Sequence, residues 1–521
     1  MANHSIFNDV LGPVMAGPSS SHSAGCARIG RLTGLLWGRP VRKARVVYDS
    51  QGSYPKTCVG QGSNFGFTGG LLGMKNDDPS LKDAERIAVS RGVEITFAQE
   101  KLSARHPNEA RIDVFDDTGE VGMSVLTLSV GGGMFRIVEM DGYRVEMDGG
   151  RAQLYVCCSR GQAQAVSAAL ASLAGEVVAA ENGTDAVLLC AVQLRCVLDE
   201  AAARAGRLPG VIWVRSAPVI LPVEICGEER PLFSTAAQAM EYAEATEKAL
   251  WELAVEYECA LGRVTGEEVM AQAMHTLDVM KAAANPPDPE KTPRFGFLPY
   301  QCEAMGRSRG TVPTVDTGCL QKAMFYALAV MENSCAHNIV SAAPTAGSSG
   351  VIPAAVLAVG EELGRTKEEI ARGLLAAGLA GAFIANQATF GAEEAGCQAE
   401  NGAASAMAAC GVVQLLGDTV RQGFDAASLA LQNLLGLICD PVGGLTEIPC
   451  ISRNIAAMGN AVLSANMVML GFDPVIPFDQ TIETMLRVGR QLPAALRCTC
   501  GGGLCLTPAA EQAVRRICRE D

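Results

Sequence analysis

The sequence predicts a multidomain α+β protein with an all-α C-terminal part, and three observations support this prediction. The chain has 521 residues, enough for three or four domains of ~100–200 residues each. Alternating apolar and polar residues, which are typical of strands, recur up to about residue 215. After about residue 230 the patterns are helical throughout, so we expect domains at 1–148, 149–225 and 226–521.

The first predicted domain, residues 1–148, mixes strands and helices. A glycine-rich stretch at 62–73 should be a loop that leads into a helix. Asp141-Gly142 should end the last strand of this domain as a turn. The segments that alternate as strands do are 44–48, 92–97, 110–115, 122–129 and 135–140.

The second predicted domain, residues 149–225, is a compact βαββαβ unit. Strand patterns cover 152–157, 175–180, 186–192 and 211–215, and helical patterns cover 162–173 and 197–205. This order suits a four-stranded antiparallel sheet with two helices on one face. It is also the order of small regulatory modules that bind ligands.

The third predicted domain, residues 226–521, is helical. A long amphipathic helix is expected over 234–257, with Ser234 as its N-cap. Glu332 is the only charge between Lys322 and Glu361, which indicates a segment buried on nearly all sides. The apolar stretch 373–392 contains amides and glycines, so we expect a buried helix there and not a membrane span.

Composition excludes several classes of protein. The apolar fraction is 49% and the charged fraction 19%, which argues against a disordered chain. The net charge of −14 and the aromatic content of 5% argue against nucleic-acid and anionic-membrane partners. The first residues lack the pattern of a signal peptide, so we expect a cytoplasmic protein. Its 19 cysteines should then be reduced thiols, metal ligands or buried apolar residues.

Two polar loops could enter a binding site. The first contains Ser19, Ser20, Ser21 and His22 between glycines; the alternative is that these serines cap a helix at 27–36. The second spans residues 343–353, and its backbone N–H groups could hold a carboxylate at a helix start. The alternative for the second loop is an ordinary connection between packed helices.

Three separated cysteines, Cys397, Cys439 and Cys450, lie beside glycine or proline in the helical part. Structural zinc sites usually show Cys-x-x-Cys pairs, and the sequence has none. Three separated thiols better suit an iron–sulfur cluster with one iron left for a substrate. The alternative is that all three are buried structural thiols.

These motifs resemble those of the bacterial iron–sulfur L-serine dehydratases (L-serine ammonia-lyases). The family's Gly-Pro-Ser-Ser-Ser-His signature is matched at 17–22 and its Ala-Pro-Thr-Ala-Gly-Ser motif at 343–348. Its two cysteine motifs, Gly-Cys-Gln-Ala-Glu and Cys-Asp-Pro…Ile-Pro-Cys, are matched at 396–400 and 439–450. Over nearly the whole chain, the resemblance implies a serine-dehydratase β-type domain, an ACT-like module and an all-α catalytic domain of the α type, fused in one polypeptide.

The resemblance also implies a cofactor and a reaction. Cys397, Cys439 and Cys450 would bind a [4Fe–4S] cluster whose open iron activates the hydroxyl of an amino-acid substrate, without pyridoxal phosphate. β-Elimination from L-serine would then give pyruvate and ammonia. The resemblance also implies a set of catalytic residues, Ser19, Ser20, Ser21 and His22, and a set of substrate-binding residues, Asn333, Thr345, Gly347, Ser348 and Arg453. For Arg453 the alternative is an ion pair on a helix surface.

Two positions depart from the family pattern. Gln61 and Asn64, also candidate substrate-binding residues, stand where relatives usually have histidine and aspartate. Because glutamine does not titrate near neutral pH, either His22 or another group is the base, or the substrate is not serine. L-Threonine, L-cysteine or a hydroxymethyl dicarboxylic acid are the alternative substrates.

Three further expectations follow from the resemblance. A non-catalytic amino-acid sensor built on the ACT-like module is the alternative to an enzyme. A homodimer is the expected assembly. In one branch of the family a C-terminal cysteine covers the open iron, and Cys518 is the candidate here, with Cys498, Cys500 and Cys505 as rivals.

Overall fold

The computed structural model describes residues 3–103, 105–225, 231–290, 296–417 and 419–520. Contacts divide the chain into two compact units. One unit is residues 21–226, and the other joins residues 1–20 to residues 227–521. The protein is therefore a mixed α and β structure with a helical C-terminal region, as the sequence indicates.

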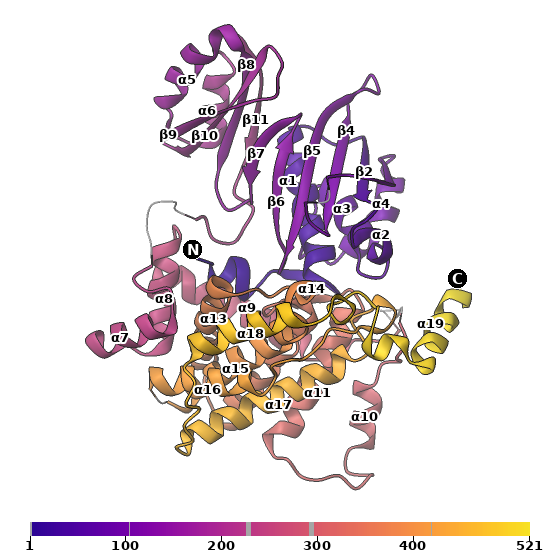
Figure 1. The fold of residues 1–521 in the computed structure, drawn as a ribbon, viewed down its shortest axis with the longest axis vertical. Coiled ribbons are helices and arrows are strands. Elements are labelled where there is room, and N and C mark those ends of the chain that lie inside the picture. Colours follow the sequence, from indigo (N-terminus) through magenta and orange to yellow (C-terminus); the bar gives the residue numbers. More distant parts are fainter. Residues whose placement is uncertain (1–2, 104, 226–230, 291–295, 418, 521) are drawn as a thin grey trace. The chain divides into compact units, whose positions relative to one another are not determined.

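The first unit, residues 21–226, contains a six-stranded sheet in the order β3-β2-β4-β5-β6-β7 (Figure 1). The β2–β3 pair is parallel, and the other neighbours are antiparallel. Apolar side chains of the helices α1 and α3 share one core with the sheet. The strands are β2 (Lys43–Asp49), β3 (Glu94–Glu100), β4 (Glu109–Phe115), β5 (Val121–Gly131), β6 (Met134–Met140) and β7 (Tyr143–Met147); the helices are α1 (Gly25–Trp37), α2 (Tyr54–Thr57), α3 (Ser63–Leu71) and α4 (Ala84–Ser90).

Strand β7 is an element that the sequence patterns missed. Met140 pairs with Tyr143, so Asp141 and Gly142 form a two-residue hairpin loop. Both have positive φ, 51° and 79°, as a type I′ turn requires. The predicted turn at Asp141-Gly142 is thus present, but it joins two strands.

The same unit contains a second sheet, four-stranded and antiparallel, in the order β11-β8-β10-β9. Its elements are β8 (Gln153–Ser159), α5 (Ala163–Ala171), β9 (Ala174–Glu181), β10 (Ala186–Leu194), α6 (Leu198–Ala205) and β11 (Val211–Ala217), which is the βαββαβ order that the sequence indicates. Leu154 and Val156 pack in a core with α5 and α6. Tyr155 and Cys157, on the other face, pack in the core of the six-stranded sheet.

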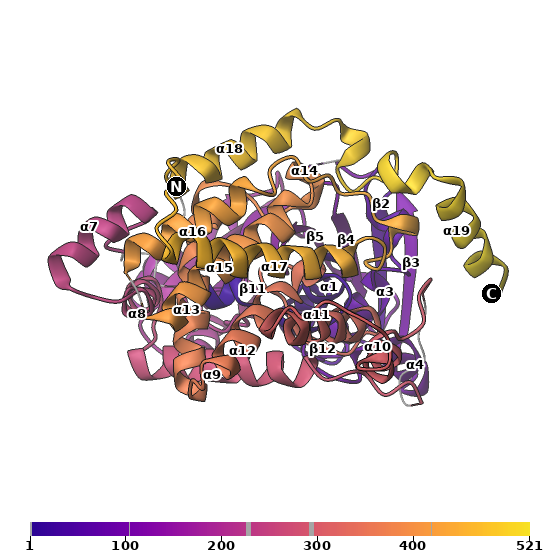
Figure 2. The same cartoon turned by 90° about the horizontal axis from the view of Figure 1, so that it is seen from below.

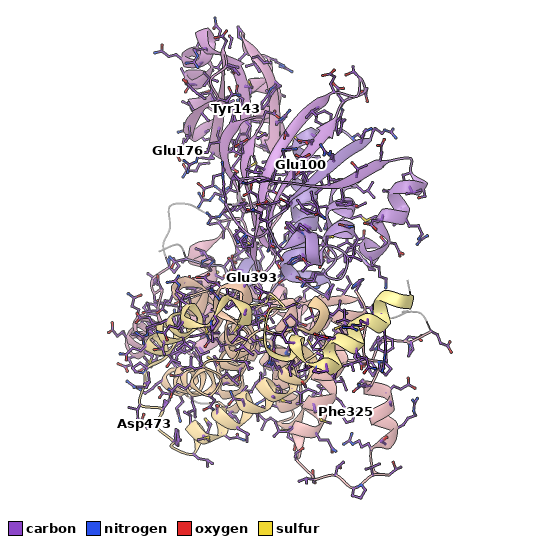
Figure 3. The ribbon with its side chains drawn as sticks, turned by 45° about the vertical axis from the view of Figure 1, so that its right-hand side comes forward. Glu100, Tyr143, Glu176, Phe325, Glu393 and Asp473 are labelled. Carbon is purple, nitrogen blue, oxygen red and sulfur yellow. The ribbon has the colours of Figure 1, made fainter. Side chains whose placement is uncertain are left out.

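This burial of both faces explains the continuous apolar run in β8, because strands covered on one side only would alternate. Tyr143 of β7, labelled in Figure 3, lies where the two sheets meet. Its hydroxyl is 3.9 Å from the Cys157 Sγ of β8.

The second unit is a helical bundle in which α13, α15, α16 and α17 pack side by side (Figure 2). Gly373 of α13 and Gly411 of α15 meet closely, since a Cβ on Gly411 would lie 2.7 Å from the Gly373 carbonyl oxygen. The helices are α7 (Ala236–Thr246), α8 (Leu250–Leu261), α9 (Gly266–Ala283), α10 (Cys302–Ser308), α11 (Cys319–Cys335), α12 (Val351–Glu362), α13 (Lys367–Gln387), α14 (Ala392–Ala395), α15 (Ala403–Leu416), α16 (Val420–Gln432), α17 (Cys450–Met469), α18 (Phe478–Gln491) and α19 (Pro508–Glu520).

Two predictions about this bundle can be compared with the structure. The apolar stretch within α13 is buried, as expected, and no helix in the described part of the chain has the length and apolarity needed to cross a bilayer. The single helix expected over 234–257 is wrong. Glu247 adopts a left-handed φ of 55° and ends α7 before α8 begins, and Thr235, not Ser234, caps α7 by accepting from Gln238 N.

The N-terminal segment is anchored on the helical unit. Strand β1 (Val14–Ala16) pairs antiparallel with β12 (Ile339–Ser341). Ser5 Oγ and Ile6 N both donate to the buried carboxylate of Glu258, whose pKa burial raises to about 7. These contacts place the start of the serine-rich loop against α11.

Gly17 should be intolerant of a side chain. An added Cβ would lie 2.0 Å from the Ser334 carbonyl oxygen, a clash with backbone that no rotamer can relieve. We expect Gly17→Ala to lower the free energy of unfolding by about 1–3 kcal/mol or more. Gly459→Ala in α17, where a Cβ meets nothing within 4 Å, is the control and should be neutral or stabilising. Urea unfolding midpoints of both variants check this prediction.

Candidate active site

The three motif cysteines lie at the starts of helical segments. Cys397 follows Gly396, whose left-handed φ of 74° turns the chain after α14, the short helix that carries Glu393 (Figure 3). Cys439 lies in the loop after α16, and Cys450 is the first residue of α17. All three side chains are buried. The Gly-Cys and Pro-Cys dipeptides of the sequence therefore mark these turns.

The closest group of donor atoms contains a residue that the sequence did not single out. Cys397 Sγ, Cys439 Sγ and a carboxylate oxygen of Glu400 lie within 4.8 Å of one another. Cys450 packs in a neighbouring apolar cluster with Cys302 and Cys335. Its thiol still interacts electrostatically with Cys397 and Glu400. Glu400 is the last residue of the Gly-Cys-Gln-Ala-Glu motif, so its position three residues after Cys397 was the available signal.

The cysteines differ in their electrostatics. The Cys439 thiol hydrogen-bonds Cys397 and, with the positive charge of Arg453, lowers the Cys397 pKa to about 6. Asn401 Nδ2 also donates to Cys397 Sγ at 3.4 Å. The pKa of Cys439 is raised by its hydrogen bonds to Cys397 and Cys498, and burial raises the pKa of Cys450. Cys397 is thus the thiolate of the set at neutral pH, the form that binds metal.

We expect the ionisation of Cys397 to be visible in the metal-free protein. Because the thiolate forms as the pH rises through the pKa, thiolate absorbance near 240 nm should increase with a midpoint of about pH 6. Cys397→Ser should remove this step. Cys410→Ala, a change at a thiol whose pKa is strongly raised by burial, should leave it in place. A wild-type titration without a step between pH 5 and 7 would contradict the assignment.

Arg453 is not on a helix surface, and the ion-pair alternative is wrong in that respect. Its Nη1 lies 2.8 Å from Oδ1 of the buried Asp440 and donates to the Ile438 carbonyl at 3.0 Å. Only 18% of the Arg453 side chain and 2% of the Asp440 side chain are exposed. Arg453 therefore holds the segment that carries Cys439. Nothing in the sequence pattern pointed to Asp440 as its partner.

The second motif packs against the cysteine site. Thr345 Oγ1 donates to Glu400 Oε1 at 2.8 Å, and Ser348 Oγ lies 3.1 Å from Thr345 Oγ1. Asn454 of α17 donates to the carbonyls of Gly347 and Cys450 at 2.7 and 2.9 Å. The structure thus brings the second motif, Glu400 and the start of α17 together. Asn454 was missed, although a buried amide four residues after Cys450 was a usable signal.

Asn333 makes structural hydrogen bonds. Its Nδ2 donates to the carbonyls of Ala283 and Asn285 at 2.9 and 2.8 Å, and its Oδ1 accepts from Asn338. The amide of Asn333 therefore ties α11 to the end of α9. Its role in binding a substrate stays a prediction.

The serine-rich loop spans the boundary between the two units, with Ser19 and Ser20 in the helical unit. Ser21 Oγ lies 2.9 Å from His22 Nδ1, and His22 Nε2 lies 3.4 Å from Ser53 Oγ. The N-cap alternative is wrong, because α1 begins at Gly25 and no side chain caps it. Burial lowers the pKa of His22 to about 4, so its imidazole is neutral at physiological pH.

The two departures from the family pattern lie in the same unit as His22. Asn64 accepts a hydrogen bond from the Tyr48 hydroxyl at 2.9 Å, and Gln61 is buried. The remaining candidate for a cysteine that covers the site divides in two. Cys498 lies beside Cys439, with its N–H donating to the Cys439 carbonyl at 2.9 Å. The side chain of Cys518 lies outside the described residues.

Comparisons with known proteins identify the family. Residues 240–505 match the family model described as the serine dehydratase alpha chain. The chain is 37% identical over 253 residues to the "Probable L-serine dehydratase, alpha chain" of Bacillus subtilis (strain 168), covering 49% of this chain and 84% of that protein. It is 35% identical over 278 residues to the "L-serine dehydratase, alpha chain" of Peptoniphilus asaccharolyticus, covering 52% of this chain and 93% of that protein.

A different relative matches a different kind of chain. The "Probable L-serine dehydratase, beta chain" of Bacillus subtilis (strain 168) is 38% identical over 156 residues, covering 30% of this chain and 69% of that protein. Relatives of both kinds thus match one polypeptide. The chain therefore belongs to the L-serine dehydratase family, with parts similar to the β and α chains of that family fused together.

Proposed function

We propose that this protein converts L-serine to pyruvate and ammonia with a [4Fe–4S] cluster bound by Cys397, Cys439 and Cys450. The observation that carries the proposal is the convergence of the Cys397 and Cys439 thiols with Glu400 within 4.8 Å, inside the family's own motifs. The names of the relatives, all L-serine dehydratases, support the same reaction.

The donor set fits an iron–sulfur cluster. The site offers thiolate sulfur, the ligand such clusters need, and Cys397 is already ionised at neutral pH. Its cysteines are buried, and the Arg453 cation offsets part of the negative charge that thiolates bring. When bound, the cluster would supply a Lewis-acidic iron for the leaving hydroxyl of the substrate.

The chain's own residues have distinct tasks in this proposal. Loss of water contact raises the Glu400 pKa well above its ordinary value, so Glu400 holds a proton beside the cysteines. Thr345, which donates to Glu400, orients that carboxyl group. The loop from Thr345 to Ser348 is proposed to bind the substrate carboxylate through its N–H groups and hydroxyls. Asn454 supports this loop from α17.

The base that removes the α-proton needs separate consideration. Gln61 cannot take up a proton near neutral pH. His22 is neutral and can accept one, but its pKa of about 4 makes it a weak base. This combination favours a second candidate function, the same elimination on L-threonine, L-cysteine or a hydroxymethyl dicarboxylic acid.

We also propose that residues 149–225 form an ACT-like module with a structural role. Support comes from its βαββαβ order and from the two cores that cover its sheet on both faces. A sheet covered in this way leaves its edges, and not its faces, for a ligand or a second module.

The test is turnover by protein purified without oxygen. We expect about four irons per chain and release of pyruvate and ammonia from L-serine at a higher kcat/KM than release of keto acid from threonine or cysteine. A protein without iron and without turnover of any hydroxy or thiol amino acid would contradict the proposal and favour a sensor.

Gln61→His tests the substrate directly. If serine is the substrate, restoring the usual histidine should be tolerated or should raise serine turnover. If Gln61 hydrogen-bonds a different substrate, the change should lower kcat/KM for that substrate about 10- to 100-fold, because a buried polar partner is lost. We would compare both proteins on serine and on the best alternative substrate. An equal change for both would show that Gln61 does not set specificity.

A further inference from the structure

Two cysteines near the C-terminus, Cys500 and Cys505, share one hydrogen-bond acceptor. Their thiols donate to the carbonyl oxygen of Pro441 at 3.3 and 3.2 Å. The two side chains also hydrogen-bond one another. A thiol is a weak donor, so one carbonyl gains little from a second thiol. The main consequence of the arrangement is that two sulfur atoms lie side by side.

The loop that carries the pair is held firmly on the segment after Cys439. Leu504 N donates to Asp440 Oδ2 at 2.8 Å. Gly503 lies so close that a Cβ there would be 2.3 Å from the same oxygen. Cys498 and Cys500 adopt left-handed φ values of 59° and 54°, which residues other than glycine rarely do. The proximity of the two sulfurs is therefore a property of the folded loop.

We propose that Cys500 and Cys505 form a redox site, a reversible dithiol–disulfide pair whose reaction partner is a small-molecule disulfide. One cysteine loses its proton and attacks a sulfur of the small disulfide, which releases one small thiolate and leaves a mixed disulfide on the protein. The other cysteine, as its thiolate, attacks the protein sulfur of that mixed disulfide and expels the second small thiolate. The protein loses two electrons and two protons, and the small disulfide gains them as two thiols.

Exposure and position give this pair a specific relation to the cysteine site. Cys500 and Cys505 are half-buried, whereas Cys397 and Cys439 are buried, so a small oxidant meets the pair first. Cys439 N donates to the Leu496 carbonyl at 2.9 Å, which joins the same loop to Cys439. An S–S bond would remove both thiol donors from Pro441 O, two residues after Cys439. We therefore expect oxidation to loosen the segment that carries Cys439.

The first experiment measures the disulfide and does not depend on the proposed function. The full chain, purified without oxygen, is incubated with oxidised glutathione, alkylated, digested with trypsin and analysed by mass spectrometry. We expect the peptide 498–515 to become two hydrogens lighter, with Cys498 alkylated and Cys500 joined to Cys505, and dithiothreitol to reverse the change. Alkylation of all three cysteines after Cys196 has already reacted would overturn the proposal, and so would a disulfide that includes Cys498.

Variants separate the two steps. Cys505→Ser should stop at a glutathione adduct on Cys500, and Cys500→Ser should stop at an adduct on Cys505. Cys196→Ser, a change at another half-buried cysteine, should form the 500–505 disulfide as the wild type does. Absence of an adduct in both single variants, together with absence of the disulfide in the wild type, would also overturn the proposal.

The second experiment tests the coupling to the cysteine site, which rests on the proposed function. Iron-loaded protein is divided into a reduced and a glutathione-oxidised sample, and the rate of iron release to a chelator is measured. We expect release to be about tenfold faster after oxidation, because groups that support a ligand change metal affinity by about 10- to 100-fold. Cys505→Ser should show no such acceleration. Equal rates in the two forms of the wild type would overturn the coupling.

Discussion

Replacing a cluster cysteine should abolish both metal binding and turnover. We expect Cys397→Ser, Cys439→Ser and Cys450→Ser each to lose bound iron and to lower kcat/KM by more than about 100-fold, since even groups that only support a ligand change metal affinity or activity 10- to 100-fold. Iron content after anaerobic reconstitution and pyruvate release from serine are the two measurements.

The structure adds a comparison that discriminates between ligand sets. Cys410→Ala, which removes a buried thiol from α15, should keep iron and turnover. Glu400→Gln keeps the shape of the side chain beside Cys397 and Cys439 but removes its ionisable group. If Glu400→Gln lost its iron while Cys450→Ser kept it, the third ligand would be Glu400. Full iron and full turnover in any of the three cysteine variants would show that this cysteine is not a ligand.

Arg453→Met should cause the second large effect, a loss of stability of about 3–5 kcal/mol. The substitution leaves the buried carboxylate of Asp440 without its cation, and an uncompensated buried charge has a cost of this size. It also removes the positive charge that helps to lower the pKa of Cys397. We therefore expect a lower urea midpoint in the metal-free protein and a thiolate step displaced above pH 6.

Two further variants are the controls for Arg453. Arg307→Met breaks the exposed pair with Glu303 and should cost less than about 0.5 kcal/mol, because water screens such pairs. Adding Asp440→Asn to Arg453→Met should recover part of the lost stability, since it removes the buried charge. A cost for Arg453→Met no larger than that for Arg307→Met would mean that the pair with Asp440 contributes little.

Local patterns predicted much of the secondary structure, and their failures have identifiable causes. Strands 110–115 and 135–140 and the buried helix at 373–392 were predictable because each repeats its apolar residues at the period of its own structure. β7 was missed because Asp141-Gly142 was interpreted as an end and not as a hairpin loop. The helix over 234–257 was predicted as one because a single left-handed residue, Glu247, leaves no sign in the apolar period.

The candidate site was predictable in its residue types and not in its contacts. The motifs named Cys397, Cys439 and Cys450 because thiols beside glycine and proline are chemically distinctive in an apolar helical region. Glu400 and Asn454 belong to or follow the same motifs, yet their importance depends on Thr345 and Gly347, which are far away in the sequence. Long-range hydrogen bonds of this kind have no local pattern.

The sequence by itself determined the family, the order of strand-rich and helical parts, and the thiol chemistry of the site, because these depend on residue identity and on short periods. The tertiary structure alone decided which groups share a charge environment. Burial makes His22 a weak base, Asp440 holds Arg453 off the surface, and Cys439 with Arg453 ionises Cys397. These properties depend on loss of water and on distances between residues remote in the chain, and packing sets both.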